Sequence, residues 1–263
     1  MTQSLSDDLA LILDAAHAAG ELALALRGQG LDVEYKAGNS PVTNADLAAD
    51  SLLKTRLRLA RPDYGWLSEE TADDPARLTA RRLFVVDPID GTRAFAKGEP
   101  HWTVCIAVVE AGRPVAGVVF APQLSETYAA ALGGGATLNG RPIQARGTCA
   151  IDGCGMIAHP RLFRRQDWPE PWPEMVIARR NSTAYRLCLV ASGSADATIT
   201  FAAKHDWDLA AADLIAGEAG AYVGDTAGRP FTYNQPVPMQ PNLVCAAPQL
   251  APLILERVRH IAL

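Results

Sequence analysis

Two carboxylates and a glycine follow a short apolar run near the middle of the first half of the chain. Residues 83–86 read Leu-Phe-Val-Val, a β-rich run typical of a buried strand, and residues 87–92 read Asp-Pro-Ile-Asp-Gly-Thr. Pro88 cannot donate to a sheet ladder and favours an extended Asp87, while Gly91 permits a tight turn whose N–H groups can face a ligand. Carboxylates that could hold Mg²⁺, beside the N–H groups of a helix start, predict a phosphate site.

The same residues also have a plainer interpretation. Asp-Pro and Asp-Gly are among the commonest turn dipeptides, so residues 87–92 could be only a turn that leads into a short helix over residues 92–95. Other acids favour a site. Residues 66–70, Trp-Leu-Ser-Glu-Glu, form a second apolar segment that ends in carboxylates. Such a pair is usually a solvated face, but with Asp87 and Asp90 downstream it indicates carboxylates that converge from neighbouring strand ends.

Two further aspartates open helices. Thr43 with Asp46 three residues later reads as a capping box, at the start of a helix that runs to residues 61–62. Asp208 stands at or next to the start of a helix over residues 209–219, where a capping aspartate needs no further explanation. Both aspartates therefore have a structural interpretation beside a functional one.

Together these segments resemble the inositol monophosphatase superfamily, the Mg²⁺-dependent, lithium-sensitive phosphatases. The string at residues 87–92 is similar to its signature, and Trp-Asp at residues 207–208 with Glu-Ala-Gly at residues 218–220 is similar to its second signature. Lys36 and Asp46 stand where the superfamily carries a lysine and an aspartate beside its active site. The segments occur in order and at ordinary spacings, so the resemblance covers nearly the whole chain.

The resemblance implies a phosphomonoesterase that uses two or three Mg²⁺ ions per active site and forms no covalent phospho-enzyme. The implied metal ligands are Glu69, Asp87, the carbonyl oxygen of Ile89, Asp90 and Asp208. Asp87 would bridge two ions. Glu69 with Thr92 would orient and deprotonate the attacking water, and Asp46 would polarise the Thr92 hydroxyl. The N–H groups of Gly91 and Thr92 would hold phosphate oxygens.

The alternatives concern the substrate and whether the chain is an enzyme. Inositol monophosphatases carry a glutamate that contacts inositol hydroxyls seven residues before the Trp-Asp aspartate, and here that position is Phe201. An apolar ring cannot accept those hydrogen bonds, which favours a 3′(2′),5′-bisphosphate nucleotidase, although Phe201 could equally be the inward-facing end of a strand. The run Asp-Gly-Thr-Arg-Ala-Phe also resembles the histidinol-phosphate phosphatases. The predicted substrate-binding residues are Gly91, Thr92, Arg93, Phe201, Lys204 and His205.

A catalytically silent scaffold with this fold is the alternative to an enzyme. It would be expected to have lost one or more of the metal carboxylates, and none of them is missing here. A fructose-bisphosphatase-like activity is a further option, for which the chain is short.

The surrounding pattern changes along the chain. Apolar segments without intervening helices predict an antiparallel sheet after the first two helices, and alternation of strand and helix then predicts an α/β half. The predicted helices cover residues 6–28, 43–61, 183–189, 209–219 and 250–260, and the predicted strands 33–36, 66–68, 83–86, 102–109, 115–121, 127–132, 175–178 and 197–201. The resemblance implies a layered αβαβα sandwich, of α+β and α/β class, divided into residues 1–145 and 146–263.

Composition limits the partners. With 263 residues, 49% of them hydrophobic, 20% charged and a net charge of −5, the chain reads as a soluble globular protein without the basic footprint of a nucleic-acid binder. Five scattered cysteines are expected to be buried thiols in a reducing cytosol. Acids and a histidine interrupt the apolar N-terminal segment, which argues against a signal peptide or membrane span. We expect a cytoplasmic homodimer that acts on a small phosphate ester.

Three other features receive structural interpretations. The glycines of residues 133–135 are not followed by Gly-Lys-Ser/Thr, so they do not predict a nucleotide loop. Residues 161–174 hold three prolines and two tryptophans and are expected to form an excursion over the substrate entrance or a subunit contact. His17 lies among alanines and is expected on the surface of its helix.

Overall fold

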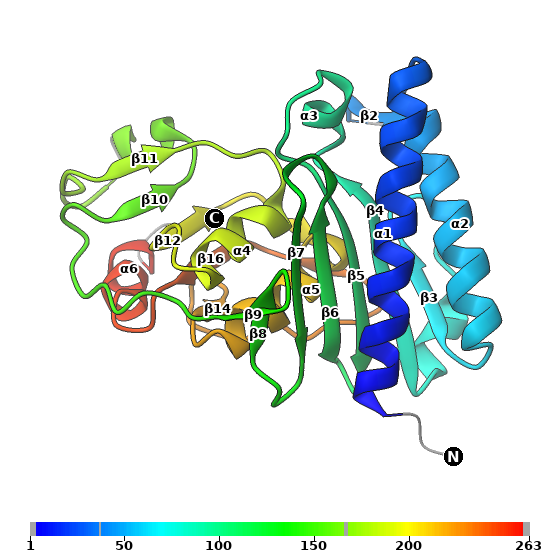
Figure 1. Cartoon of the computed structure of the whole chain (residues 1–263). Helices are drawn as coiled ribbons and strands as arrows, with labels where there is room; N and C mark the ends of the chain where they lie inside the picture. Colours follow the sequence, from blue (N-terminus) through cyan, green and yellow to red (C-terminus); the bar gives the residue numbers. More distant parts are fainter. Residues whose placement is uncertain (1–3, 37, 166–167, 260–263) are drawn as a thin grey trace.

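Helices and sheets alternate in layers, as Figure 1 shows for the computed structural model, which describes residues 4–36, 38–165 and 168–259. Two helices cover the outer face of a seven-stranded sheet, two lie between it and a five-stranded sheet, and one packs on the outer side of the second sheet. In this order they are α1 (Leu5–Gln29) and α2 (Asn44–Ala60), α4 (Thr183–Ala191) and α5 (Asp206–Glu218), and α6 (Ala251–Val258). This arrangement is the predicted αβαβα sandwich.

The larger sheet has the order β3-β4-β5-β6-β7-β8-β9 and is antiparallel except for one pair. Its strands are β3 (Gly65–Ser68), β4 (Arg82–Asp90), β5 (Thr103–Glu110), β6 (Arg113–Ala121), β7 (Glu126–Ala131), β8 (Ala136–Leu138) and β9 (Arg141–Ile143). The exception is β3 with β4, which run parallel and pair Ser68 with Val86. Glu69, which follows β3, therefore lies at the level of Asp87, which is still part of β4 and pairs with Cys105 of β5.

The smaller sheet has the order β11-β10-β12-β16-β14 and mixes parallel and antiparallel pairs. Its strands are β10 (Gly155–Ile157), β11 (Val176–Ala178), β12 (Ala197–Thr200), β14 (Tyr222–Gly224) and β16 (Leu243–Ala246). Two short ribbons lie outside both sheets, β1 (Val33–Lys36) with β2 (Ser40–Thr43) and β13 (Lys204–His205) with β15 (Met239–Gln240). The division that we expected at residue 145 stays a prediction.

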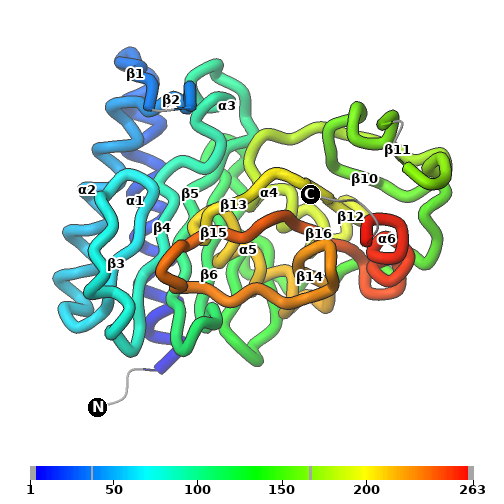
Figure 2. Tube along the Cα trace, turned by 180° about the vertical axis from the view of Figure 1, so that it is seen from behind, coloured from blue at the N-terminus to red at the C-terminus, as the bar shows by residue number. Residues whose placement is uncertain are grey.

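Short helical turns complete the description. They are α3 (Thr92–Ala96), which confirms the predicted short helix, and the 3₁₀ turns η1 (Pro75–Thr79), η2 (Pro122–Leu124) and η3 (Pro160–Arg164). Figure 2 shows the opposite side of the molecule, where the β13–β15 ribbon runs past the first turn of α5 toward β4.

Small residues let α1 lie close to the sheet. The buried face of α1 includes Ala15, Ala16 and Ala19, and a Cβ built on Gly20 would lie 2.6 Å from the Phe120 ring of β6. Length and hydropathy alone would let α1 cross a membrane. The buried face of α1 packs on β5, β6 and α2, and 33% of its most apolar window is buried.

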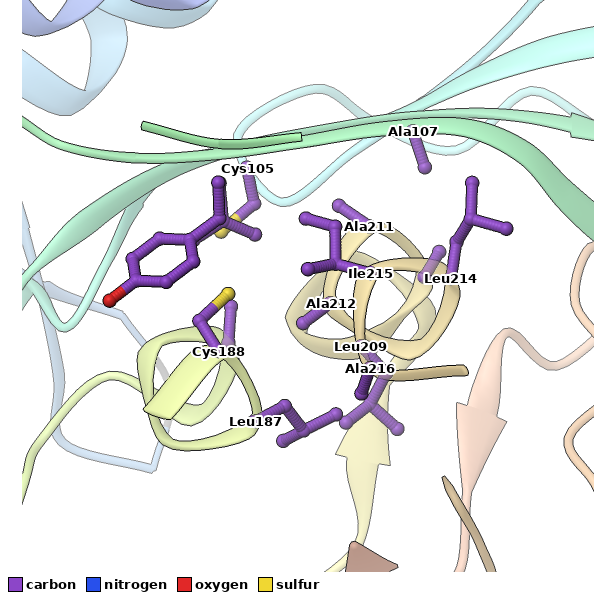
Figure 3. Close-up of a cluster of buried hydrophobic side chains, with 14 of the residues drawn as sticks. Cys105, Ala107, Leu187, Cys188, Leu209, Ala211, Ala212, Leu214, Ile215 and Ala216 are labelled. Atoms are coloured by element: carbon purple, nitrogen blue, oxygen red, sulfur yellow. The ribbon is translucent and has the colours of Figure 1, made fainter. Parts of the chain in front are cut away.

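The central helices approach the sheet in the same way. Figure 3 shows Leu187 and Cys188 of α4 and the apolar residues of α5 beneath the strand that carries Cys105 and Ala107. A Cβ on Gly117 of β6 would lie 2.8 Å from the carbonyl oxygen of Ala211 on α5. The backbones of β6 and α5 therefore touch, and this contact sets the height of α5 above the sheet.

Several predicted boundaries are wrong by a few residues. Ser4, not Ser6, caps α1, since its hydroxyl accepts from the N–H of Asp7 at 3.2 Å. Residues 40–43, predicted mostly as loop, pair with β1. α5 begins at Asp206 because His205 is its N-cap, and β12 ends one residue before Phe201. Strands β8, β9, β10, β13, β14, β15 and β16 were not predicted, because runs of two to four residues carry little periodicity.

Other structural predictions fared differently. Cys105, Cys154, Cys188 and Cys245 are buried as expected, but Cys149 is exposed. The N–H groups of Gly133 and Gly135 both donate to the Glu218 carboxylate at 2.8 Å. These donors are therefore paired with a side chain of the protein rather than with a nucleotide phosphate. His17 is exposed on α1 and contacts the Thr127 hydroxyl, as a surface residue should. The predicted excursion of residues 161–174 contains η3, and residues 166 and 167 lie outside the described residues.

The contact between β6 and α5 generates a test. Gly117→Ala must displace the backbone of α5, so we expect a loss of about 1–3 kcal/mol in the free energy of unfolding. Gly217→Ala is the matched control on α5 itself, because a Cβ there meets nothing within 4 Å, and alanine is the better helix former. Urea denaturation of both variants measures the difference. An unchanged unfolding midpoint for Gly117→Ala would contradict the close approach.

Candidate active site

The signature turn joins β4 to α3. The pairing of β4 with β5 shifts register between Asp87 and Asp90, and Gly91 then adopts a φ of 96°. The carbonyl oxygen of Gly91 accepts from the N–H groups of Ala94 and Phe95, which starts α3. A side chain at Gly91 would be strained by this φ and would meet the His101 carbonyl oxygen at 3.2 Å. Glycine is therefore required where the chain turns out of the sheet.

Three aspartates converge at this turn. One ligand oxygen each from Asp87, Asp90 and Asp208 lies within 4.8 Å of the other two. Asp87 and Asp90 come from the end of β4, and Asp208 comes from the first turn of α5, where its Oδ2 accepts from the N–H of His205 at 3.0 Å. The structure thus brings together three of the predicted metal ligands from sequence positions more than a hundred residues apart.

Hydrogen bonds orient two of these carboxylates. The N–H of Ile89 donates to Asp87 Oδ1 at 3.0 Å, whereas Asp87 Oδ2 is buried and has no hydrogen-bond partner among the described residues. Asp90 Oδ2 accepts from the Ser182 hydroxyl at 2.7 Å and from the N–H of Ala184 at 2.8 Å. One oxygen of each side chain is therefore fixed by the protein, and the other can face a ligand.

The electrostatics of the cluster call for a cation. Burial, followed by the charges of neighbouring carboxylates, holds the pKa of Asp87 well above its usual range. Burial and the charge of Asp208 raise the pKa of Asp90 from 3.8 to about 6, and burial also raises the pKa of Asp208. A buried, unpartnered oxygen among mutually repelling carboxylates is the donor set that a hard divalent cation satisfies. The residues therefore fit the implied metal.

Glu69 lies beside this cluster but is not one of its three members. Lys36 Nζ is 3.2 Å from Glu69 Oε1 and 2.6 Å from Glu70 Oε2. Burial raises the pKa of Glu69, and the charge of Lys36 acts in the opposite direction. Lys36, which the family resemblance placed near the site, thus offsets part of the charge of the glutamate pair, and the role of Glu69 as a metal ligand stays a prediction.

Asp46 contacts both Thr43 and Thr92, and its catalytic role stays a prediction. Thr43 donates its N–H at 2.8 Å and its hydroxyl at 2.5 Å to Asp46 Oδ2, which completes the capping box. The Thr92 hydroxyl lies 3.1 Å from Asp46 Oδ1 and 3.0 Å from the Ile89 carbonyl oxygen, and it can donate to either. One carboxylate therefore links the start of α2 to the signature turn.

The predicted substrate-binding residues are less closely grouped. Lys204 acts electrostatically on Asp90 and Asp208, so it lies beside the cluster. His205 stacks on Trp207 with ring centroids 4.3 Å apart. Arg93 is exposed and donates to the carbonyl oxygen of Asn39. The substrate-binding roles of these residues stay predictions.

Phe201 is half-buried in a third apolar cluster. Its ring centroid is 6.0 Å from that of Trp168, and the Arg165 guanidinium lies 5.8 Å from its ring centroid. These contacts agree with Phe201 as part of a satellite core, which the sequence had left open, and its predicted place in a substrate pocket is untested.

Arg186 is a candidate functional residue that the sequence did not reveal. Its guanidinium donates to the Ser182 carbonyl oxygen at 3.3 Å and to the Thr183 hydroxyl at 2.9 Å. Burial lowers the pKa of Arg186, and the charges of Asp90 and Asp208 act against this effect. Within the described ranges, neither Arg186 nor Lys204 forms an ion pair. Only the fold connects α4 with the aspartates, so no local pattern could have identified this arginine.

Comparisons with known proteins agree with this geometry. The sequence profile of the inositol monophosphatase family matches residues 5–262. The 3′(2′),5′-bisphosphate nucleotidase CysQ of Escherichia coli K12 is 34% identical over 227 residues, 78% of this chain and 84% of CysQ. The histidinol-phosphatase of Chlorobaculum parvum is 34% identical over 232 residues, 86% of this chain and 88% of the relative. An IMPase structure from Thermotoga maritima superposes with a TM-score of 0.84 and 27% identity, covering 96% and 97% of the two chains.

The chain belongs to the inositol monophosphatase family. It is a metal-dependent phosphomonoester hydrolase, and the relatives that carry nucleotidase and histidinol-phosphatase names match it with the same identity.

The raised carboxyl pKa values generate a second test. Between its ordinary pKa of 3.8 and the value of about 6, Asp90 of the folded, metal-free protein binds more protons than Asp90 of the unfolded chain, so its contribution to stability falls as pH rises through this window. Burial lowers the pKa of His101 and of His205, which acts in the opposite direction, so the test compares a variant with wild type. We expect the Tm of metal-free Asp90→Asn, relative to that of wild type, to be higher at pH 7 than at pH 5, and Mg²⁺ or Mn²⁺ to raise the wild-type Tm more at pH 7. The same Tm difference between variant and wild type at both pH values would contradict the assignment.

Proposed function

We propose that this enzyme uses two or three Mg²⁺ ions to hydrolyse a small phosphate monoester by direct attack of water. The observation that carries the proposal is the cluster of Asp87, Asp90 and Asp208 with its unpartnered buried oxygen. Glu69 and the Ile89 carbonyl oxygen would add ligands. When bound, Mg²⁺ supplies positive charge that neutralises the phosphate and lowers the pKa of the attacking water.

Residues of the signature turn would handle the proton and the phosphate. When the Thr92 hydroxyl donates to Asp46, its lone pairs remain available to accept a hydrogen bond from water. A glutamate whose pKa is raised by burial, as that of Glu69 is, is a better proton acceptor near neutral pH. The N–H groups of Gly91 and Thr92, at the start of α3, would bind phosphate oxygens.

The role of Asp90 can be tested by removing its charge alone. Asp90→Asn keeps the shape of the side chain and its contacts with α4, but it should lower kcat by at least ~100-fold, because metal assistance of this kind is worth several kcal/mol. Phosphate release and circular dichroism are measured on the same preparation. A folded variant that retains more than about a tenth of the wild-type kcat, a loss below ~1.4 kcal/mol, would show that Asp90 is not a ligand.

We also propose that the leaving group carries a second anionic group, as in a 3′(2′),5′-bisphosphate nucleotide. Arg186 and Lys204 place two positive charges next to the aspartate cluster without an ion pair of their own. A half-buried guanidinium that forms no ion pair among the described residues is well suited to bind a phosphate, since its planar set of N–H donors matches the phosphate oxygens. The similarity to CysQ supports this substrate class.

The same charges disfavour the competing substrates. The alcohol released from histidinol phosphate carries an amine, which Arg186 and Lys204 would repel. Inositol needs hydrogen-bond acceptors, and Phe201 offers none at the position where inositol-specific relatives carry a glutamate. A screen of 3′-phosphoadenosine 5′-phosphate, histidinol phosphate and inositol 1-phosphate with Mg²⁺ compares the three classes directly.

Arg186→Ala tests the second anion site. We expect kcat/KM for 3′-phosphoadenosine 5′-phosphate to fall ~10–100-fold, which corresponds to about 1.4–2.7 kcal/mol and to the loss of a hydrogen bond to a charged group. The value for inositol 1-phosphate should change less than ~3-fold. Arg113→Ala, at an exposed residue of β6, is the control for loss of a positive charge. An equal loss of kcat/KM for both substrates would show that Arg186 does not recognise the second anionic group.

We propose further that the enzyme is a cytoplasmic homodimer that acts on small molecules rather than nucleic acid polymers. All five cysteines are free, which suits a reducing compartment. The net charge of −5 favours neither nucleic acid nor an anionic membrane surface. Light scattering at micromolar concentration measures the state of assembly.

A further inference from the structure

Asp50 is a buried carboxylate on α2 that the chemistry described above does not use. Its exposed fraction is 8%. Its Oδ1 accepts from the Ser68 hydroxyl at 2.5 Å, and its Oδ2 accepts from the Thr71 hydroxyl at 2.7 Å. Ser68 and Thr71 flank Glu69 and Glu70. The two oxygens of one side chain therefore hold both ends of the turn that presents the glutamate pair.

The Asp50 charge is held by hydroxyl groups. Among the residues that the structure describes, Asp50 has no ion pair. Burial of an unpaired carboxylate is unfavourable, and two hydroxyl donors offset only part of that penalty. A neutral side chain would stabilise a turn of this kind at a lower energetic cost. Departures of this kind from ordinary packing are expected where a site must be positioned.

Other contacts fix the same turn from its remaining sides. The N–H of Glu69 donates to the Val86 carbonyl oxygen of β4 at 3.3 Å. The indole N–H of Trp66 donates to the Thr71 hydroxyl at 3.3 Å. The turn is thus attached to β4 through its backbone and to α2 through Asp50. The Asp50 contacts therefore fix the distance between Glu69 and α2.

The spacing of the acids on α2 extends this connection. Asp46 precedes Asp50 by four residues, one helical turn, and both side chains are buried on the same face. Asp46 contacts the Thr92 hydroxyl, and Asp50 holds the turn of Glu69. Glu69 and Thr92, which are expected to orient the attacking water, are therefore both positioned by α2. The apolar face of α2, with Ala45, Ala49 and Leu53, packs in the core.

We propose that Asp50 is a positioning residue that sets the Glu69–Glu70 turn at the metal centre, an inference that rests on the proposed Mg²⁺-dependent function. Without the Asp50 contacts the turn keeps its backbone bond to β4 and the Lys36 and Trp66 contacts, but it loses its attachment to α2. Residues that hold metal ligands in place are typically worth 10–100-fold in metal affinity.

Three variants separate geometry from charge. Asp50→Asn turns one acceptor into a donor and removes the charge. Ser68→Ala and Thr71→Val remove one hydroxyl each and leave the Asp50 carboxylate in place, so any weaker metal binding in them cannot come from lost attraction. Asp196→Asn is the control, because Asp196, just before β12, is also buried and accepts from a threonine, Thr148, at 2.7 Å, although it also lies 3.7 Å from Arg146.

The experiment is a calorimetric titration of metal-free protein with Mg²⁺, paired with the Mg²⁺ dependence of phosphate release. We expect ~10–100-fold weaker Mg²⁺ binding in Asp50→Asn and ~3–30-fold in Thr71→Val and Ser68→Ala, with kcat at saturating Mg²⁺ within ~3-fold of wild type. Asp196→Asn should lower Tm without changing Mg²⁺ affinity.

The outcomes separate this inference from the function on which it rests. A lowered Tm with Mg²⁺ affinity within ~2-fold of wild type in Thr71→Val and Ser68→Ala would make the contacts merely structural and would overturn the inference. These two variants decide the question if Asp50→Asn fails to fold. Wild-type protein that binds no Mg²⁺ would instead overturn the proposed magnesium centre, and the role of Asp50 with it.

Discussion

Mutual repulsion among Asp87, Asp90 and Asp208 is the constraint on which the rest of the structure depends. Three carboxylates with oxygens within 4.8 Å of one another do not assemble by themselves, and burial raises the cost of their charges. The apolar layers on both sides of the seven-stranded sheet must supply the folding free energy that holds them together. A bound divalent cation would reduce this repulsion, so the protein should be more stable with metal bound than without it.

Each acidic residue is delivered by an element whose position is fixed by backbone packing. The parallel pairing of β3 with β4 brings Glu69, just after β3, to the level of Asp87 in β4. The contact of Gly117 with Ala211 seats α5, and with it Asp208, against β6. Such backbone contacts allow little adjustment, because protein interiors are packed like crystals. The precision of the site therefore comes from small residues far from the chemistry.

The sequence predicted the parts of this site that lie within single segments. The signature turn, the capping box of Asp46 and the start of α5 each have a local pattern, and the resemblance to a family joined them. The sequence could not predict that Arg186 lies near the aspartates, that Ser182 donates to Asp90, or that Ser68 donates to Asp50. Each of these contacts joins elements that are brought together only by the tertiary fold. Most short strands of the second sheet were not predicted for a similar reason, since they are defined by pairing with neighbouring strands rather than by periodicity in the sequence.

The central claim is that the three aspartates form a divalent cation site. Anomalous diffraction from a crystal of the protein soaked in Mn²⁺ measures this directly, because Mn²⁺ prefers the same oxygen ligands as Mg²⁺ and scatters anomalously. We predict at least one strong peak in contact with carboxylate oxygens of Asp87, Asp90 and Asp208, and none in a crystal of Asp90→Asn at the same position. A wild-type crystal with no peak at these residues, at a Mn²⁺ concentration that supports phosphate release, would contradict the claim.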